Sequence, residues 1–486
     1  MAAGVSDVDP RPEAGPPAES EALRADAVAT RARILDAAAS LADDRRTSMI
    51  EIAAAAGVGR STLYRHFPSR QALRQALRSR RAGPTEPPPS DRVSPLPFQP
   101  PGRLGRSQPL ALEVTHILDE VPPHLVPDQL VAEARRAAGV PVALYVIDID
   151  GSQLIRLAGS EDFPHELDAP PALGPEIVPE GLREYEARLR ERLPGCVAEP
   201  LWLRGRVLGL LLCIGIPVTP LGDIAKQGAA ALELAGDYTD SIEAARRRKP
   251  TTPAAEIQQN LFPPRVARIS GAQLAGGLLP TYEVGGDWFD FVENRDGAWL
   301  AIADAAGKGA TAAGLGAAAL GSLRAARRSG HDLVESLELM DETVRALGNR
   351  DFHVTAVVAR WRAATSEFTW VNCGHPHAFL VDLEGVMSEL AGPVHPALGG
   401  PTGPGIFTPT SRQLQTGERL ILVTDGITGR RTESGGQFGA DGIRAAIEPL
   451  SDATAAATAM AILQAVTECW REPLEDDGTV VVLRVE

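Results

Sequence analysis

Apolar residues in the first part of the chain recur at helical spacing and predict a small helical unit. The first predicted helix carries four of them on one face: Ile34, Leu35, Ala38 and Leu41. A second helix over Met49–Ala56 begins behind Thr47 and Ser48, which are good N-cap residues. Gly57 predicts a turn, and Arg60–Phe67 predicts a third short helix after it.

In the middle of the chain the apolar positions alternate, which predicts antiparallel strands accompanied by helices. Two helical patterns come first, Leu110–Val121 and Asp128–Ala138. A strand over Pro141–Gly151 is followed by a partner strand, and Glu199–Val218 predicts a hairpin that turns at Arg204-Gly205-Arg206. A helix from about Leu221 to Arg248 closes this α+β region. Continued through Leu261, with a break near Pro250–Pro253, it would couple the region to the next.

Short apolar runs in the last part predict buried strands, and several of these runs lie next to aspartate. The aspartates stand in YEVGGDWFDFV (Asp287 and Asp290), WLAIADAAGKGA (Asp304), RLILVTDGITG (Asp425) and LEDDGTVVVLRV (Asp476 and Asp477). One carboxylate at a strand end is usually a turn or cap residue. Four such positions, each beside glycine or another aspartate, point instead to a shared site.

Proline divides the chain. Residues 1–22 are rich in Pro, Ala and Glu and are predicted to be disordered, and residues 83–109 form a Pro-rich linker. Proline lacks a backbone N–H and favours extended backbone, which suits a semi-rigid connection. Three folded blocks remain: 24–82, 110–247 and 253–486.

Charge separates the first block from the rest. The 486-residue chain has a formal net charge of −15, which argues against nucleic acid wrapping along its whole length. Residues 24–82 nevertheless hold 12 arginines against 5 acidic residues, a formal charge of +7, and the remainder carries −22. The argument against nucleic acid therefore applies to the body of the chain only.

The spacing of the cysteines and the lengths of the apolar runs indicate in which cellular compartment the protein works. The four cysteines are far apart and form no CxxC pair, so a disulfide scaffold and a cysteine zinc site are both disfavoured. The longest apolar run, Val207–Val218, is shorter than the roughly 20 residues that span a bilayer. The first ten residues have no signal pattern. We expect a cytoplasmic protein with no membrane partner.

The first block carries a sequence, IAAAAGVGRSTLYRHFPSRQAL, that resembles the helix-turn-helix of TetR-type repressors. The resemblance implies an all-α, DNA-binding head, whose predicted contacts are Arg60, Ser61, Thr62, Tyr64, Arg65 and His66. A helical docking module with a solvated arginine-rich surface is the alternative. Because one head reads one half-site and no TetR-type effector domain follows, we expect a homodimer.

The order of elements in residues 110–247 resembles a GAF-type sensory domain, mainly through the closing hairpin and the long exit helix. The resemblance implies an α+β sensor of an unassigned ligand. A dimerisation or spacer domain is an equally good interpretation. Cys196 and Cys213 are expected to be packed thiols, since free cysteine is commonly buried.

The aspartates of the third block predict a metal site. Converging carboxylates repel one another, and a divalent cation removes that repulsion. Ligands that are all oxygen favour Mg²⁺ or Mn²⁺ over zinc. Two such ions can lower the pKa of a shared water and clamp a phosphate during in-line attack.

The same motifs, in this order, resemble the metal-dependent PPM (type 2C) phosphatases, and within them the stage II sporulation protein E group. The resemblance covers residues 253–486 and includes AEIQQNLFPP, VGGDWFD, IADAAGKGATAA, NCGHPHAFL, LVTDGITG and DDGTVVV. It implies an α-β-β-α sandwich with two Mn²⁺ or Mg²⁺ ions at one end. The multidomain fold class would thus combine a helical head, an α+β sensor and this sandwich.

The resemblance also implies roles for single residues. Asp304 would bridge the two ions, with the Ala305 carbonyl on one of them. Asp425 and Asp476 would bind the second ion, and Asp287 would contact the site directly or through water. Asp477, Gly286 and Gly307 would support the ligands without touching the metal.

Two other motifs carry less weight. Lys308 lies in a Gly-Lys-Gly turn and is positioned to meet a phosphate, but Gly309 follows it, so this is not a Walker loop. His375 and His377 have the spacing of zinc ligands. The resemblance makes His375 part of a structural GHP turn and His377 incidental.

The predicted function is hydrolysis of phosphoserine or phosphothreonine on a regulatory phosphoprotein. By family analogy the substrate is an anti-sigma-factor antagonist. The alternative is a transcription regulator whose phosphatase-fold domain is an inactive sensor. The four intact aspartates, Asp287, Asp304, Asp425 and Asp476, argue against that alternative. A scaffold that only assembles partners is a second alternative.

Overall fold

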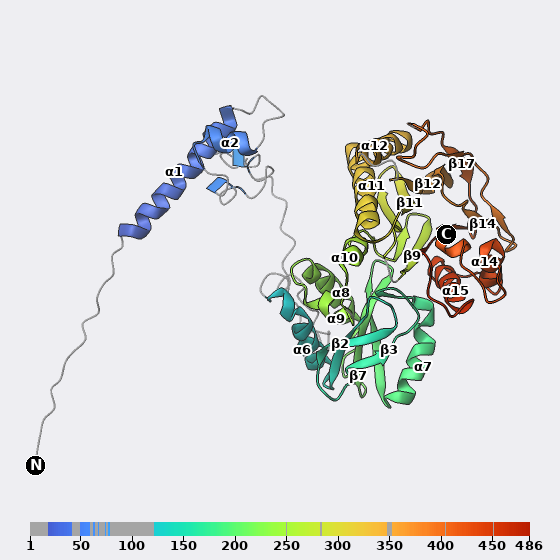
Figure 1. Ribbon diagram of the computed structural model, residues 1–486. Helices are drawn as coiled ribbons and strands as arrows, with labels where there is room; N and C mark the ends of the chain where they lie inside the picture. Colours follow the sequence, from blue (N-terminus) through green and yellow to red (C-terminus); the bar gives the residue numbers. More distant parts are fainter. Residues whose placement is uncertain are drawn as a thin grey trace, which may run out of the picture. The chain divides into compact units, whose positions relative to one another are not determined.

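The chain forms two compact units, Met1–Leu104 and Gly105–Glu486 (Figure 1). The computed structural model describes residues 18–40, 49–58, 62–63, 67, 73, 76–77, 121–248, 250–281, 284–347, 352–403, 405–450 and 452–486. Among the helices in these ranges, none is both long and apolar enough to cross a membrane. The predicted linker, 83–109, lies outside the described residues.

The first unit holds the predicted helical head. Its described helices are α1 (Ala18–Ser40) and α2 (Met49–Ala55). Apolar side chains from both helices and from Leu63 and Phe67 form one buried cluster, which includes Ile34 as predicted. Gly57 has a φ of 63°, the left-handed conformation that a turn after α2 requires.

One boundary in this unit differs from the prediction. α1 begins at Ala18, so the last five residues of the stretch predicted to be disordered are helical. Their sequence, AESEA, contains strong helix formers, and this propensity outweighs the proline-rich context before them. Leu41, predicted to complete the first helix, lies outside the described residues.

The second unit begins with a seven-stranded sheet of order β3-β2-β1-β7-β5-β4, with β6 paired to β7. Its strands are β1 (Val142–Ile147), β2 (Gln153–Gly159), β3 (Glu166–Asp168), β4 (Ala172–Leu173), β5 (Glu176–Ile177), β6 (Cys196–Leu203) and β7 (Arg206–Ile214). Each recorded pair is antiparallel. Residues 121–248, which contain this sheet, are called the middle region below.

Helices cover both faces of the middle sheet, because its central strands β1 and β7 are apolar at nearly every position and successive side chains point to opposite faces. Leu144 and Leu211 pack against α6 (Val126–Ala138) and α8 (Gly222–Gly236). Tyr145 and Leu210 face the other way, toward α7 (Leu182–Arg192). The α+β architecture is as predicted, while the GAF-type resemblance stays a prediction.

The predicted hairpin is confirmed, and the predicted exit helix is interrupted. Arg204 and Gly205 both have positive φ values, 51° and 87°, as a two-residue type I′ turn requires. The helix expected from Leu221 is instead two helices, α8 and α9 (Ser241–Arg246). Thr239 Oγ1 accepts the Ser241 N–H at 3.2 Å, and this side-chain bond replaces a helical one between them.

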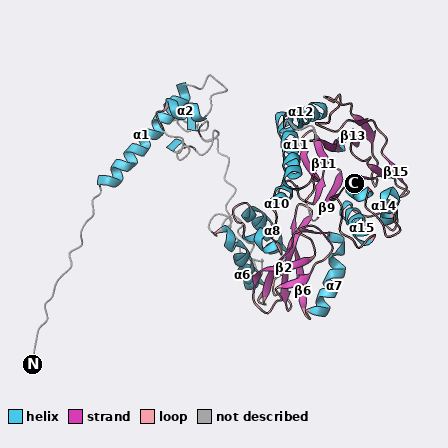
Figure 2. Ribbon diagram, viewed as in Figure 1, coloured by secondary structure: helices cyan, strands magenta, loops and turns pink. Residues whose placement is uncertain are grey.

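The rest of the unit is the predicted α-β-β-α sandwich (Figure 2). The first sheet comprises β10 (Trp288–Asn294), β11 (Gly297–Ala305), β12 (Val354–Arg362), β13 (Glu367–Cys373), β16 (Val394–His395) and β17 (Thr410–Gln413). The second comprises β8 (Val266–Ile269), β9 (Ala272–Leu279), β14 (Phe379–Val381), β15 (Met387–Glu389), β18 (Arg419–Val423) and β19 (Gly478–Val485). We call residues 253–486 the sandwich region.

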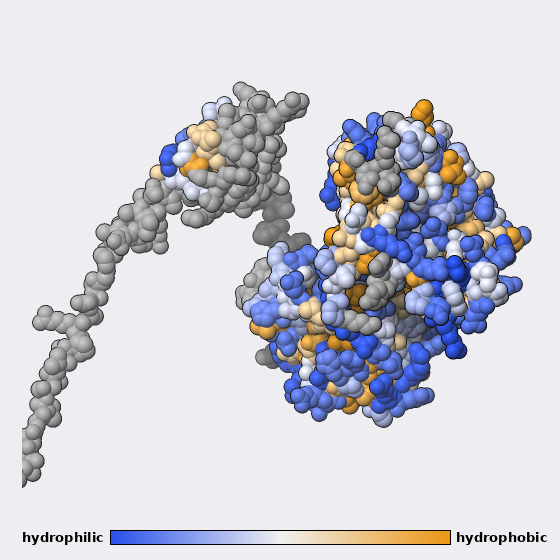
Figure 3. Space-filling model, viewed as in Figure 1, coloured by the Kyte–Doolittle hydropathy of each residue, from blue (hydrophilic) through white to orange (hydrophobic). Residues whose placement is uncertain are grey.

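Three buried clusters stack through the sandwich. Leu300 and Leu483 belong to the central one, between the sheets. Trp299, next to Leu300, faces α11 (Gly309–Ser329) and α12 (Leu333–Ala346) on one outer face. Val482 faces α14 (Gly439–Ile447) and α15 (Ala455–Glu468) on the other. Hydrophilic side chains predominate on the outer surface shown in Figure 3.

The middle and sandwich regions meet within one compact unit. Glu176 of β5, which is 3% exposed, accepts the backbone N–H groups of Arg265 and Val266 at 2.9 and 2.8 Å. Leu173 and Val178 join the buried cluster beneath α15. The connection runs through α10 (Pro253–Gln259), which begins at the predicted break, with Thr252 as its N-cap.

Candidate active site

Strand register brings the predicted aspartates to one end of the sandwich. Asp287 directly precedes β10, and β10 pairs with β11 so that Trp288 lies opposite Ala303. Asp287 therefore lies beside Asp304, near the end of β11. Asp425 follows β18, and Asp476 and Asp477 precede β19, which is the antiparallel neighbour of β18.

Asp287 joins the two sheets through hydrogen bonds. Its side chain is 2% exposed, and Oδ2 accepts the hydroxyl groups of Thr424 and Thr479, each at 2.7 Å. Both threonines are fully buried. Burial raises the pKa of Asp287 well above its usual value, and the neighbouring charge of Asp304 adds to this.

The carboxylate of Asp304 feels the charges of several other aspartates of the site. Burial raises its pKa to about 7, and the charges of Asp425, Asp476 and Asp477 contribute further. The pKa of Asp476 is also raised, first by burial and then by Asp425 and Asp477. The carboxylates are thus close enough to repel one another through a partly desolvated space, as a site built for cations would be.

Asp477 differs from its neighbours because its carboxylate is saturated with donors. Oδ2 accepts bonds from Gln258 Nε2 at 2.7 Å and Gly285 N at 2.9 Å. Oδ1 accepts bonds from the backbone N–H and the hydroxyl of Thr281, at 2.8 and 2.9 Å. A carboxylate offers about four lone-pair positions, and these donors occupy them. Asp477 is therefore arranged to hold the surrounding loops.

Gly286, in the loop before β10, lies directly against the backbone at the end of β11. A Cβ on Gly286 would lie 1.9 Å from the carbonyl oxygen of Ala305, so any side chain there would clash with that backbone. Gly307 has a φ of 104° in the turn that follows. Gly286 thus lets the two backbones approach closely, and Gly307 turns the chain toward α11. Their predicted support of metal ligands stays a prediction.

Sequence reasoning missed the polar residues that hold the aspartates. Thr424 and Thr479 are hydroxyl residues at the ends of otherwise apolar strands, and that contrast was the available signal. Gln258 is 1% exposed and lies four residues after the buried Ala254 in α10. A polar residue on the buried face of a short helix indicates a specific buried partner.

The structure assigns the remaining candidates to other tasks. Asp290, which the sequence placed beside Asp287, forms ion pairs with Arg324 and Arg327 of α11 at 2.9 and 2.7 Å. Lys308 is exposed, and its Nζ donates to the Glu475 carbonyl at 2.9 Å, next to Asp476.

His375 is fully buried, with Nδ1 2.9 Å from the Thr355 hydroxyl. Burial lowers its pKa to about 3, so the ring is neutral at ordinary pH. The interpretation of His375 as structural agrees with this placement. His377 is half-buried.

The donor set fits hard divalent cations, although it is not closed around one. Across the part of the chain that the structure describes, no three His, Cys, Asp or Glu side chains are grouped tightly enough to hold a metal ion. The available donors are all oxygen: Asp287, Asp304, Asp425, Asp476 and the Ala305 carbonyl. Such donors select Mg²⁺ or Mn²⁺. Burial raises the pKa of Asp287, Asp304 and Asp476, and neighbouring carboxylates raise it further, so a bound cation would favour their charged forms.

Comparison with known families agrees with this geometry. Residues 294–486 match the family described as Stage II sporulation protein E (SpoIIE). The chain carries a SpoIIE-type phosphatase domain. Residues 34–77 match the family described as bacterial regulatory proteins, tetR family, so the head is a TetR-type helix-turn-helix. Asp304, Asp425 and Asp476 lie within the SpoIIE match, and Asp287 lies just before it.

Several characterised proteins are similar to this chain. The phosphoserine phosphatase RsbU of Bacillus subtilis (strain 168) is 24% identical over 239 residues, which are 48% of this chain and 68% of that protein. The SiaA-PP2C domain of Pseudomonas aeruginosa is 21% identical with a TM-score of 0.42, over 53% of this chain and 100% of that one. A solved structure of RsbU and RsbW domains from Mycobacterium tuberculosis is 23% identical, with a TM-score of 0.39, over 45% of this chain and 61% of that one.

The family matches confirm the predicted class for both ends of the chain. The C-terminal region belongs with the PPM-type serine/threonine protein phosphatases, as its motifs predicted. The head belongs with the TetR-type helix-turn-helix units. Of its six predicted DNA contacts, Thr62 is described and half-buried, while Arg60, Ser61, Tyr64, Arg65 and His66 lie outside the described residues.

Proposed function

We propose that this SpoIIE-type chain is a Mn²⁺- or Mg²⁺-dependent serine/threonine phosphatase that acts on a regulatory phosphoprotein. The observation that carries the proposal is the convergence of Asp304 with Asp425 and Asp476 at one end of the sandwich. Burial raises the pKa of Asp304, and the charges of these neighbours add to the shift. Two bound divalent ions would supply an activated water and charge neutralisation for in-line attack on phosphorus.

Each residue then has a defined task. Asp304 would contribute to both ions, with the Ala305 carbonyl on one of them and Asp287 at the other, directly or through water. Asp425 and Asp476 would hold the other ion. Thr424 and Thr479 orient Asp287 by donating to Oδ2, and such support of a ligand typically changes metal affinity by about 10–100-fold.

A protein is the substrate class that the surface around the aspartates favours. Asp425 and Lys308 are exposed, so a phosphorylated side chain on a folded partner can reach them. Lys308 offers the phosphate a cation beside Asp476. RsbU is a phosphoserine phosphatase, which supports phosphoserine as the substrate group. An anti-sigma-factor antagonist is the partner that the family resemblance suggests.

The test is phosphate release from a phosphoserine protein during Mn²⁺ and Mg²⁺ titrations. We expect metal-dependent turnover by the wild type and a loss of at least about 10³-fold in Asp304→Ala. Asp441→Ala, which removes an exposed aspartate of α14, serves as the matched control and should retain full activity. Equal rates in the wild type and Asp304→Ala would favour the alternative of an inactive sensor.

We further propose that the TetR-type head binds DNA and that the chain acts as a homodimer. The match over residues 34–77 and the local charge of +7 support DNA binding. Two heads would read two half-sites. Duplex binding by the full chain should weaken steeply with salt, as phosphate contacts require. Binding that is absent, or insensitive to salt, removes this part of the proposal.

A further inference from the structure

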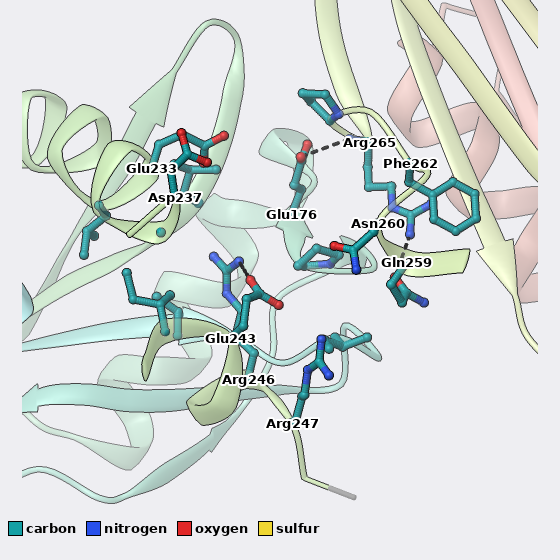
Figure 4. A pocket seen from close by; sticks show the side chains of 18 of the residues that line it. Glu176, Glu233, Asp237, Glu243, Arg246, Arg247, Gln259, Asn260, Phe262 and Arg265 are labelled. Atoms are coloured by element: carbon teal, nitrogen blue, oxygen red, sulfur yellow. Dashed lines mark hydrogen bonds and ion pairs between the residues drawn. The ribbon is translucent and has the colours of Figure 1, made fainter. Parts of the chain in front are cut away.

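A cavity of about 730 Å³ lies between the middle and sandwich regions (Figure 4). Its walls come from the end of α8, from α9, from α10 and from the segment that leads into β8. None of the proposed metal ligands lines it. Its volume falls within the roughly 300–1,000 Å³ of typical small-molecule sites.

Most of the charged groups in this cavity already have partners. Arg206 pairs with Glu176 at 2.9 Å and also with Glu233. Arg246 pairs with Glu243 at 2.9 Å. Arg247 pairs with Glu256, from the first turn of α10. These contacts balance three of the four arginines that line the cavity.

Arg265 is the exception. Within the described part of the chain, no carboxylate lies at ion-pair distance from its guanidinium. Nη2 donates a long bond of 3.3 Å to Gln259 Oε1, and Nη1 is buried without a partner. The guanidinium carbon lies 3.9 Å from the centre of the Phe262 ring and 5.3 Å from the centre of the Phe289 ring.

This arrangement is costly for a cation. Arg265 is 5% exposed, and burial lowers its pKa to about 10 despite the nearby charge of Glu176. A buried charge is normally paired or hydrogen-bonded, because desolvation without compensation is expensive. A side chain kept in this state beside a cavity indicates a partner that is not part of the chain.

We propose that the cavity binds a small organic molecule with one anionic group, a carboxylate or a phosphate monoester, and that Arg265 anchors that group. Phe262 supplies an aromatic wall next to the anchor. Glu233 and Asp237 lie on the opposite side of the cavity (Figure 4) and disfavour a second negative charge there. The site therefore selects single anionic groups over polyphosphates.

The bound molecule would touch the helix that supports the aspartates. Gln259 and Asn260 line the cavity, and the preceding residue, Gln258, donates to Asp477. The proposed site is separate from the phosphatase centre, and its occupancy can be measured without turnover.

The experiment uses the full chain in EDTA, where the aspartate cluster repels anions and no metal can capture them. Benzoate, phenyl phosphate and neutral phenol share one ring, and their binding is followed by calorimetry at constant ionic strength. We expect saturable binding of benzoate or phenyl phosphate, and none of phenol. The stronger of the two anions identifies the anionic group that the site prefers.

Two variants test the location. Arg265→Gln removes the anchor and should weaken binding by about tenfold or more, as loss of a charged hydrogen bond does. Gly236→Leu places a bulky side chain at the cavity wall and leaves Arg265 in place, because Gly236 lines the cavity and a Cβ there meets no atom within 4 Å.

Arg183→Gln on the exposed face of α7 and Gly321→Leu on α11 are the matched controls and should bind as the wild type does. Absence of saturable binding by either anion overturns the proposal. Binding that survives both cavity variants overturns it equally, because the anion then lies elsewhere, for example on the basic head.

Discussion

Gln258 Nε2 donates a 2.7 Å hydrogen bond to Asp477 Oδ2, across 219 positions of the chain. The same amide donates to the Asp287 carbonyl at 3.0 Å. One side chain of α10 therefore holds both the loop before β10 and the loop before β19. Since α10 connects the middle region to the sandwich, the packing of these regions and the geometry of the aspartates depend on one helix.

Replacing Gln258 with leucine should weaken metal binding. Asp477 would lose one of its two donors on Oδ2, and the loops that carry Asp287 and Asp476 would be held less firmly. We expect the Mn²⁺ concentration at half-saturation to rise by about 10–100-fold, measured by direct Mn²⁺ binding as well as by activity.

Gln259→Leu is the control for the Gln258 variant, because it alters the adjacent residue of the same helix without touching either loop. Its Mn²⁺ affinity should equal that of the wild type. Equal losses in both variants would show that the helix as a whole matters and that the Gln258 amide does not.

Asp304→Asn should stabilise the metal-free protein while it abolishes activity. The folded pKa of about 7 exceeds the usual 3.8, so the native state disfavours the charged form at pH above 7. That penalty is complete above pH 7, shrinks as pH falls below 7 and vanishes below pH 3.8, whereas the neutral amide removes it at every pH. We expect a gain on the order of 3 kcal/mol in unfolding free energy at pH 8 in EDTA, measured by denaturant titration.

The corresponding control for Asp304→Asn is the wild type with saturating Mn²⁺. Metal should stabilise the wild type and leave the variant nearly unchanged. A variant that is less stable than the wild type in EDTA would contradict the view that repulsion dominates at this site.

Asp290→Asn should destabilise the fold without changing metal affinity. Asp290 is 4% exposed and holds two arginines of α11, so its loss leaves those charges partly unbalanced. Breaking a buried ion pair costs roughly 3 kcal/mol. Thermal unfolding should show the loss, while Mn²⁺ affinity stays within about twofold of the wild type. A large fall in affinity would mean that Asp290 belongs to the metal site.

His375 should make the protein less stable in mild acid. Its folded pKa of about 3 lies below the usual 6.5, so between these values the unfolded chain binds more protons than the native state. Stability from this group is therefore complete above pH 6.5 and falls as pH drops below it. The loss between pH 7 and pH 5 is about 2 kcal/mol.

The variant that isolates this effect is His375→Gln, compared with the wild type by denaturant titration at both pH values. Carboxylates with raised pKa values, such as Asp287, have the opposite pH dependence, and they contribute equally to both proteins. The difference between the two slopes should be the His375 contribution. Parallel slopes would show that the imidazole is not kept neutral.

Local patterns were sufficient for the elements and for the chemistry of the site. The residue pattern predicted the hairpin at Arg204-Gly205, and the strand-end aspartates predicted carboxylates at one end of the sandwich. Their assignment as metal ligands stays a prediction. Both signals are local, because side-chain alternation and turn residues act over a few positions. The break between α8 and α9 was not predicted. The apolar residues there keep a helical period, while the Thr239 hydroxyl accepts the Ser241 N–H that a continuous helix would use.

The sequence by itself determined which groups are available: oxygen ligands at strand ends, glycines beside them, and a basic helix-turn-helix at the other end of the chain. Only the tertiary structure decided how similar groups are used. Asp287 and Asp290 are three residues apart, yet one faces Thr424 and Thr479 while the other pairs with α11. Asp477 and Gln258 meet across most of the sandwich region. Such choices depend on contacts between distant segments, and these form only when the sheets pack.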